Sequence, residues 1–184
     1  MPTRPKFFLL DAGPVIELHR LGVWERIVET CDLLVPRHIA LEEARFWVHE
    51  DGSIHAIHLQ RDIEAGRIRA PEAEPETVIE ILNIFDPVMR EGVDAGELAA
   101  LAILMDWPGE ERPVFCTGDR LATVALCLLG FSELAVSLEE LLDNLGLSRE
   151  PRRQFRRGKM DAWVKEGTER RLRGEGLKKG EDDD

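Results

Sequence analysis

Short apolar runs alternate along the chain with longer stretches in which apolar residues recur every three or four positions. The first run, Phe7 to Leu10, contains no polar residue and is typical of a strand that is buried on both faces. Runs of this kind predict strands at 6–10, 32–36 and 113–119, a short edge strand at 67–71, and a brief strand before Ser137.

The longer stretches predict helices that separate these strands. Gly22 divides the first stretch in two, Pro87 breaks another, and Ser137 with Glu140 three residues later forms a capping-box pattern. Because strands and helices alternate, the pattern predicts an α/β fold, a three-layer α/β/α sandwich with a central parallel sheet. The predicted helices cover 14–21, 23–30, 37–50, 54–66, 74–92, 94–107 and 120–130, with one more after Ser137.

Charge divides the chain of 184 residues into two parts. Residues 1–148 hold 12 basic and 27 acidic side chains, a net charge of −15, whereas residues 149–179 hold 12 basic and 5 acidic ones, a net charge of +7. We therefore predict one domain over 1–148 and a charged C-terminal tail over 149–184 that is partly helical or disordered. The acidic body argues against nucleic-acid binding by charge alone.

Hydropathy and cysteine usage set the expected location. No run approaches 18 consecutive apolar residues, so no membrane contact is predicted, and the N-terminal apolar run is too short for a secretory signal. Cys31, Cys116 and Cys127 form no paired framework, and two of them lie in apolar segments. We expect reduced, buried cysteines and a cytoplasmic protein.

The first strand ends on an acid. Asp11 is followed by Ala12, Gly13 and Pro14, where a helix is predicted to begin. Asp11 could cap that helix, with proline in its first turn. It could also lie at the carboxyl end of a parallel strand, where open α/β sheets place their ligands. These residues alone leave both interpretations open.

Three further acids occupy comparable places: Glu42 lies early in the helix predicted after the second strand, Glu97 lies in the first turns of the alanine-rich helix, and Asp119 follows the segment VFCT. Each alone is also what a helix start favours. Together they would meet at one sheet edge, where carboxylates repel unless a cation or a shared proton separates them. Oxygen ligands favour Mg²⁺ or Mn²⁺ over zinc.

Four segments resemble the successive blocks of PIN-domain proteins, in order and at plausible spacing. They are FFLLDAGPVIELHRLG, LLVPRHIALEE, DAGELAALAIL and VFCTGDRLATVALCLLG, and the resemblance covers roughly residues 6–145. It implies a PIN-like fold and a metal-dependent ribonuclease that uses Mg²⁺ or Mn²⁺ to hydrolyse RNA, leaving a 5′-phosphate. Many bacterial members are toxins of toxin–antitoxin pairs, so the resemblance also implies an antitoxin protein or a homodimer as partners.

The resemblance assigns roles to individual residues. Glu42 takes the place of the second acid because the family block runs Pro36, Ile39, Glu42, with Glu43 as the alternative. Family members often carry Thr-Asn or Ser-Asn after the first acid, whereas Ala12 and Gly13 stand here. The implied catalytic acids are Asp11, Glu42, Glu97 and Asp119, the implied metal ligands are Asp11, Glu97 and Asp119, and the supporting residues are Thr117, Glu43 and Asp94.

The charge of the tail suggests a contact with RNA. Its net charge of +7 motivates the hypothesis that the arginines at its start bind the RNA backbone. These are Arg152, Arg153, Arg156 and Arg157.

Other kinds of protein share some of these features. A PIN-like module that binds RNA or a protein without cutting would keep the same fold. An aspartate-nucleophile phosphatase normally has a second aspartate two residues after the first, and position 13 is glycine. His49, His55 and His58 lack the cysteine pair of a typical zinc site, and the chain has no phosphate-binding glycine loop of the G-x-x-x-x-G-K kind.

Overall fold

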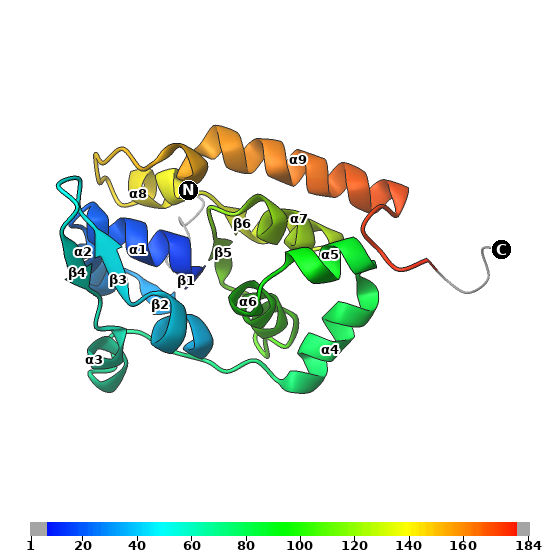
Figure 1. The fold of residues 1–184 in the computed structure, drawn as a ribbon, viewed down its shortest axis with the longest axis horizontal. Helices are drawn as coiled ribbons and strands as arrows, with labels where there is room; N and C mark the ends of the chain where they lie inside the picture. Colours follow the sequence, from blue (N-terminus) through cyan, green and yellow to red (C-terminus); the bar gives the residue numbers. More distant parts are fainter. Residues whose placement is uncertain (1–6, 180–184) are drawn as a thin grey trace.

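A central sheet of four parallel strands organises the computed structural model, which describes residues 7–179. The strands lie in the order β2-β1-β5-β6, and β1 is therefore interior (Figure 1). Leu9 of β1 is in register with Leu34 on one side and with Phe115 on the other. The predicted α/β fold with a parallel sheet is confirmed. The strand bounds are β1 (Phe7–Leu10), β2 (Asp32–Leu34), β5 (Val114–Cys116) and β6 (Ala135–Val136).

Helices cover both faces of this sheet. Phe8 and Leu10 point into a core built with α1, α2 and α8, whereas Leu9 points into a second core built with α4 to α7. All three are fully buried, as the unbroken apolar run predicts. The helices are α1 (Ala12–Arg20), α2 (Trp24–Thr30), α3 (Leu59–Glu64), α4 (Pro75–Ile84), α5 (Pro87–Gly92), α6 (Ala95–Met105), α7 (Arg120–Leu128) and α8 (Leu138–Asn144), with a 3-10 turn η2 (Ser132–Leu134).

Local signals fix several helix boundaries where the sequence predicts them. Gly22 adopts a φ of 68°, a left-handed conformation that ends α1. The chain breaks between α4 and α5, and the Asp86 side chain accepts a 2.8 Å hydrogen bond from the Met89 N–H in the first turn of α5. Ser137 caps α8 by accepting from the Glu140 N–H at 3.1 Å.

The helix predicted over 37–50 is correct only for its first half. Residues 37–43 are helical and end in a π-helical turn, η1 (Ile39–Glu43), which the Ala44 N–H closes on the Ile39 carbonyl at 2.9 Å. The chain then enters an antiparallel hairpin of β3 (Phe46–Val48) and β4 (Ile54–Ala56). The predicted helix over 54–66 likewise reduces to β4 and the shorter α3.

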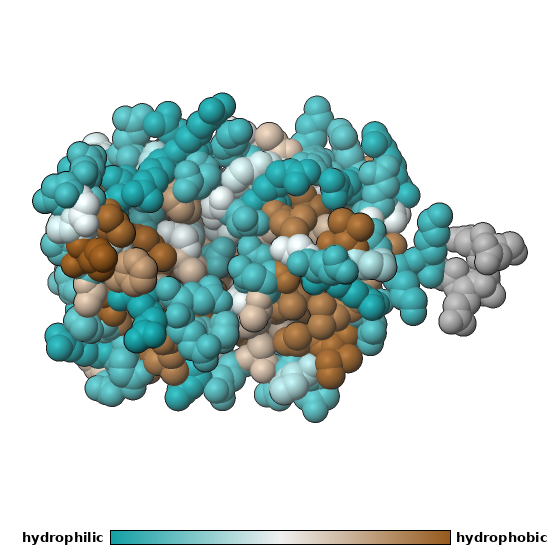
Figure 2. Space-filling view, viewed as in Figure 1, coloured by the Kyte–Doolittle hydropathy of each residue, from teal (hydrophilic) through white to brown (hydrophobic). Residues whose placement is uncertain are grey.

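The hairpin explains this error physically. Trp47 packs against the core beneath the hairpin and stacks on His55 with ring centroids 4.4 Å apart. Phe46, Val48 and Ile54 point the other way and are 52%, 44% and 71% exposed. Figure 2 shows apolar side chains gathered over β3 and β4 on the left of the molecule. Alternation along these short strands outweighed the helical spacing of the apolar residues.

The C-terminal segment lies on the domain. A 3-10 turn, η3 (Arg153–Phe155), leads into α9 (Arg157–Arg173), which lies along α7 and α8 (Figure 1). Phe155, Met160 and Gly167 are buried. Residues 174–178 continue to the break between α4 and α5, where the Asp86 N–H donates to the Gly176 carbonyl at 2.9 Å. The part of the predicted tail at 180–184 lies outside the described residues.

Opposite charges hold this segment in place. Arg157 pairs with Asp143 of α8 at 3.5 Å, and Arg120 of α7 pairs with Glu166 of α9. The segment therefore pairs a base with an acid of α8 and an acid with a base of α7. Within residues 7–179, no helix combines the length and the apolar character needed to cross a membrane.

Gly167 gives a test of this docking. A Cβ there would lie 2.6 Å from Cys127 Cβ and 3.1 Å from the Val124 backbone of α7. We expect Gly167→Ala to push α9 away and to lower the free energy of unfolding by about 1–3 kcal/mol. Urea unfolding followed by circular dichroism measures this change.

Gly158, in the first turn of α9, is the matched control. Apart from its chain neighbours and the backbone of its own helix, no atom of residues 7–179 lies within 4 Å of a Cβ built there. Gly158→Ala should leave stability unchanged or raise it by up to about 1 kcal/mol through helix propensity. Equal effects of the two alanines would contradict the close packing of α9 on α7.

Candidate active site

Asp11 lies where β1 meets α1 at the carboxyl edge of the sheet. Its Oδ1 accepts a 2.8 Å hydrogen bond from the Ala12 N–H and thereby caps α1. Its Oδ2 accepts a 2.7 Å hydrogen bond from the Thr117 hydroxyl, which follows β5. The side chain is buried. The two interpretations of Asp11 are therefore compatible, because one oxygen caps the helix and the other faces the neighbouring strand end.

Thr117 connects Asp11 to Asp119. Its hydroxyl oxygen accepts a 3.0 Å hydrogen bond from the Asp119 N–H, and the same hydroxyl donates a hydrogen bond to Asp11. The Asp119 carboxylate caps α7 by accepting from the Leu121 and Ala122 N–H groups at 2.6 and 3.0 Å. The TGD segment thus fixes two acids around one threonine.

Glu97 enters the same region from the start of α6. Asp94 caps this helix by accepting from the Glu97 N–H at 2.8 Å, and Glu97 returns a bond by accepting from the Asp94 N–H at 3.0 Å. This capping box holds Glu97 in place although the residue is only 5% exposed.

Glu43, and not Glu42, points toward these acids. A Cβ built on Gly96, in the first turn of α6, would lie 2.7 Å from Glu43 Oε2, so this carboxylate touches α6. The Glu42 side chain is 68% exposed. His38 joins the two, with Nε2 3.1 Å from Glu43 and Nδ1 3.5 Å from Glu42. The wide π-helical turn of η1 sets which glutamate faces inward.

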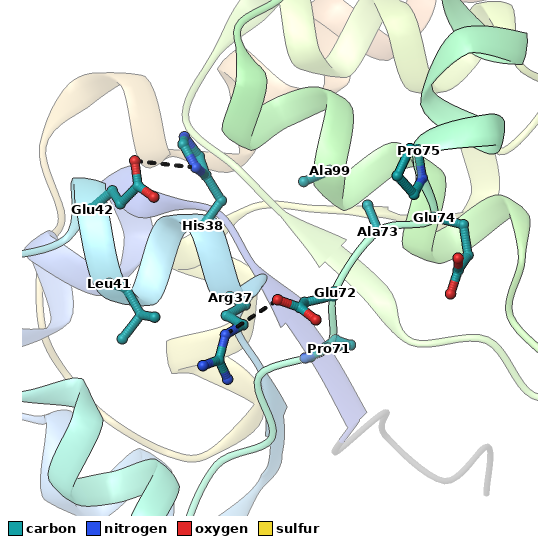
Figure 3. A pocket seen from close by; sticks show the side chains of 10 residues that line it. All are labelled: Arg37, His38, Leu41, Glu42, Pro71, Glu72, Ala73, Glu74, Pro75 and Ala99. Carbon is teal, nitrogen blue, oxygen red and sulfur yellow. Dashed lines mark ion pairs between the residues drawn. The ribbon is translucent and has the colours of Figure 1, made fainter.

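Glu42 instead lines a pocket of about 530 Å³ beside the acids. Figure 3 shows Glu42 next to His38 on one wall, with Arg37 reaching Glu72 on the opposite segment at 3.3 Å. Ala99 of α6 closes one side. His38 had no signal in the sequence, because only the fold reveals that it bridges both glutamates.

Burial and mutual repulsion change the acidity of this group. Burial raises the pKa of Asp11 to about 6, although the bonds from Thr117 and Ala12 favour its charged form. Burial also raises the pKa of Glu97 to about 8, and the charges of Asp119 and Asp94 add to the rise. The pKa of Glu43 is raised by burial and by Asp94. Within residues 7–179, no lysine or arginine forms an ion pair with Asp11, Glu97 or Asp119.

The donors of this cluster suit Mg²⁺ or Mn²⁺ in type but do not enclose an ion as they lie. In the described part of the chain, no three His, Cys, Asp or Glu side chains are grouped so that they could hold one metal. Mg²⁺ usually keeps several waters and binds only one or two protein carboxylates. Asp11 with Glu97 or Asp119 would supply such a partial set of oxygen ligands.

The four arginines predicted to bind RNA differ in their surroundings. Arg152 lies 3.7 Å from buried Glu17, Arg156 pairs with Glu150 at 2.5 Å, and Arg157 pairs with Asp143. Arg153 forms no ion pair within the described residues and lines a pocket of about 420 Å³ with Lys159. Among the described residues, Arg153 and Lys159 are therefore the cations without an ion pair at this pocket, which Arg156 and Glu139 also line.

Comparison of the chain with family models, with curated proteins and with solved structures finds no match in any of the three. The functional argument therefore rests on the geometry and chemistry described above.

The raised pKa of Glu97 predicts a pH dependence of stability. The pKa is about 8 in the folded state and 4.5 in the reference state, so the folded protein keeps the proton over this interval. Stability without metal should fall as pH rises from about 4.5 to about 8. Glu97→Gln should flatten this fall and raise the free energy of unfolding at pH 9 by at least about 1 kcal/mol.

The measurement is urea unfolding in EDTA across this pH interval. Glu42→Gln, at an exposed position outside the cluster, is the control and should follow the wild type. A Glu97→Gln protein with the same fall in stability as the wild type would contradict the burial of an uncompensated carboxylate.

Proposed function

We propose that this protein is a ribonuclease that hydrolyses RNA phosphodiester bonds with Mg²⁺ or Mn²⁺. The observation that carries the proposal is a pair of buried acids, Asp11 and Glu97, with raised pKa values and no ion pair to a lysine or arginine of residues 7–179. Such a site gains stability from a bound cation, which removes the repulsion and favours the ionised carboxylates.

The residues would divide the work as follows. Asp11, together with Glu97 or Asp119, would hold the ion, and Glu43 would add a further carboxylate next to α6. Thr117 would orient Asp11 through its hydroxyl hydrogen bond. When bound, the ion would activate a water molecule and neutralise charge on the phosphoryl group. The acidic body would therefore not prevent RNA binding at this site, because a bound cation would reverse the local charge.

Asp11→Asn tests the metal site. The amide keeps an oxygen for the Ala12 N–H but loses the negative charge, so we expect Mn²⁺ binding and RNA cleavage to be lost. Calorimetric titration of EDTA-treated protein with Mn²⁺ measures binding, and a fluorescent RNA oligonucleotide measures cleavage. Absence of Mn²⁺ binding by the wild type would instead favour a PIN-like module that binds RNA or protein without cutting.

Glu43→Gln and Glu42→Gln form the matched pair for this experiment. Glu43→Gln should reduce cleavage on the order of 100-fold if Glu43 acts together with Asp11 and Glu97, and Glu42→Gln should have little effect. The reverse order would show that Glu42 is the functional acid. Retention of metal-dependent cleavage by Asp11→Asn would refute the assignment of the site.

The unpaired cations at the start of α9 predict where RNA contacts the protein. Arg153 and Lys159 line one pocket and form no ion pair with the described residues. Arg156 lines the same pocket but pairs with Glu150, and Arg152 and Arg157 lie beside Glu17 and Asp143. Each lost phosphate contact should reduce the slope of log affinity against log salt by about 0.7 for single-stranded RNA. The double variant Arg153→Gln, Lys159→Gln should therefore reduce the slope by about 1.4.

Lys165, exposed farther along α9 and also without an ion pair in the described residues, is the control. Fluorescence anisotropy at several salt concentrations, with Asp11→Asn to prevent cleavage, gives the slopes. If Lys165→Gln changes the slope as much as either pocket substitution, the pocket has no special role in RNA binding.

A further inference from the structure

Phe155 lies against the two turns that carry Asp11 and Asp119. Its ring touches Gly13, two residues after Asp11, where an added Cβ would lie 3.2 Å from Cε1. It also touches Gly118, between Thr117 and Asp119, where an added Cβ would lie 3.1 Å from Cζ and still closer to Cε1. Only glycine at position 118 permits this approach. One aromatic side chain from the C-terminal segment thus packs on both acid-bearing turns.

Glu17 fixes the position of this ring. The Glu17 side chain is only 1% exposed, and its carboxylate accepts hydrogen bonds from Arg20 at 2.6 and 2.8 Å. The same carboxylate accepts from the Arg152 N–H at 2.8 Å. The turn that follows is closed by the Phe155 N–H, which donates to the Arg152 carbonyl at 2.9 Å. The buried Glu17 carboxylate on α1 therefore fixes the start of η3, and η3 places Phe155 against the two turns.

The ring also lies beside a short chain of hydrogen bonds. The Asp119 N–H donates to Thr117, and Thr117 donates to Asp11. Gly118 is the residue between the two partners of the first bond, so displacement of the Gly118 backbone would disturb both bonds. Phe155 is 4% exposed and fills the space on the side of Gly118 that it contacts.

We propose that Phe155 is a positioning residue that holds the Asp11 and Thr117–Asp119 turns in register, so that the C-terminal segment completes the active site. The functional part of this proposal rests on the ribonuclease function proposed above, whereas the structural part does not. A misplacement of about 1 Å in a catalytic group can cost on the order of 100-fold in rate. The segment outside the PIN-like blocks would thus be needed for catalysis.

Hydrogen exchange of the Asp119 amide in the full-length protein tests the proposal without requiring any activity. In Phe155→Ala the protection of this amide should fall about tenfold or more, because the turn opens locally. Phe155→Leu, which keeps most of the apolar volume, should restore much of it. The same variants should lower kcat for RNA cleavage while KM changes little.

Met160→Ala is the matched control on the same segment. Met160 is also 4% exposed, but its Sδ contacts the Thr123 hydroxyl of α7, which donates to the Asp119 carbonyl and not to the bond made by the Asp119 amide. It should loosen α9 without changing Asp119 exchange or kcat. Two results would overturn the proposal: unchanged Asp119 protection in Phe155→Ala, or an equal loss in Met160→Ala.

Two further outcomes are separable. If Phe155→Ala does not fold, Asp119 protection in Phe155→Leu should still be lower than in Met160→Ala, and equal protection in these two variants would overturn the proposal. If the wild type neither binds Mn²⁺ nor cleaves RNA, the ribonuclease function falls, and Asp119 exchange still decides whether Phe155 holds the turns.

Discussion

The hydrogen bond from Thr117 to Asp11 joins the ends of β1 and β5, and the site depends on it. The parallel register that pairs Leu10 with Cys116 brings the next residues, Asp11 and Thr117, side by side. The bond directs one Asp11 oxygen toward the sheet edge while the other caps α1. Any shift of these strands would separate the two turns that carry the acids.

Capping explains how the fold tolerates buried acids. Asp11, Asp94 and Asp119 each accept backbone N–H bonds at a helix start, which stabilises their charge before any ion binds. Glu97 also accepts a backbone bond, from the Asp94 N–H, but burial and the charges of Asp119 and Asp94 outweigh it and raise its pKa to about 8. The structural and functional roles of these residues are therefore complementary. The helix caps hold the acids in place, and the remaining repulsion is what a cation would relieve.

Helix boundaries could be predicted because they depend on local signals. Features that depend on contacts between residues distant in sequence could not be predicted. Gly22, Asp86 and Ser137 act on their immediate neighbours, so the boundaries they set follow from a few residues each. The choice between Glu42 and Glu43 depends on a π-helical turn and on Gly96 of α6, more than 50 residues away. The contact of Phe155 with Gly118 also needs the whole fold. The helical spacing over 44–50 misled because Trp47 packs on the core from a strand of the hairpin and not from a helix.

The charge of the C-terminal segment has a different use from the one its composition suggests. Two arginines at its start face acids of the body, Arg152 beside Glu17 and Arg157 beside Asp143, and Arg156 pairs with Glu150 within the segment. Exposed pairs of this kind add little stability singly. Buried Glu17 contributes more, because its carboxylate is fully satisfied only when the Arg152 N–H is in place. The ion pairs therefore join the segment to the body, and Glu17 and Phe155 fix its position next to the acids.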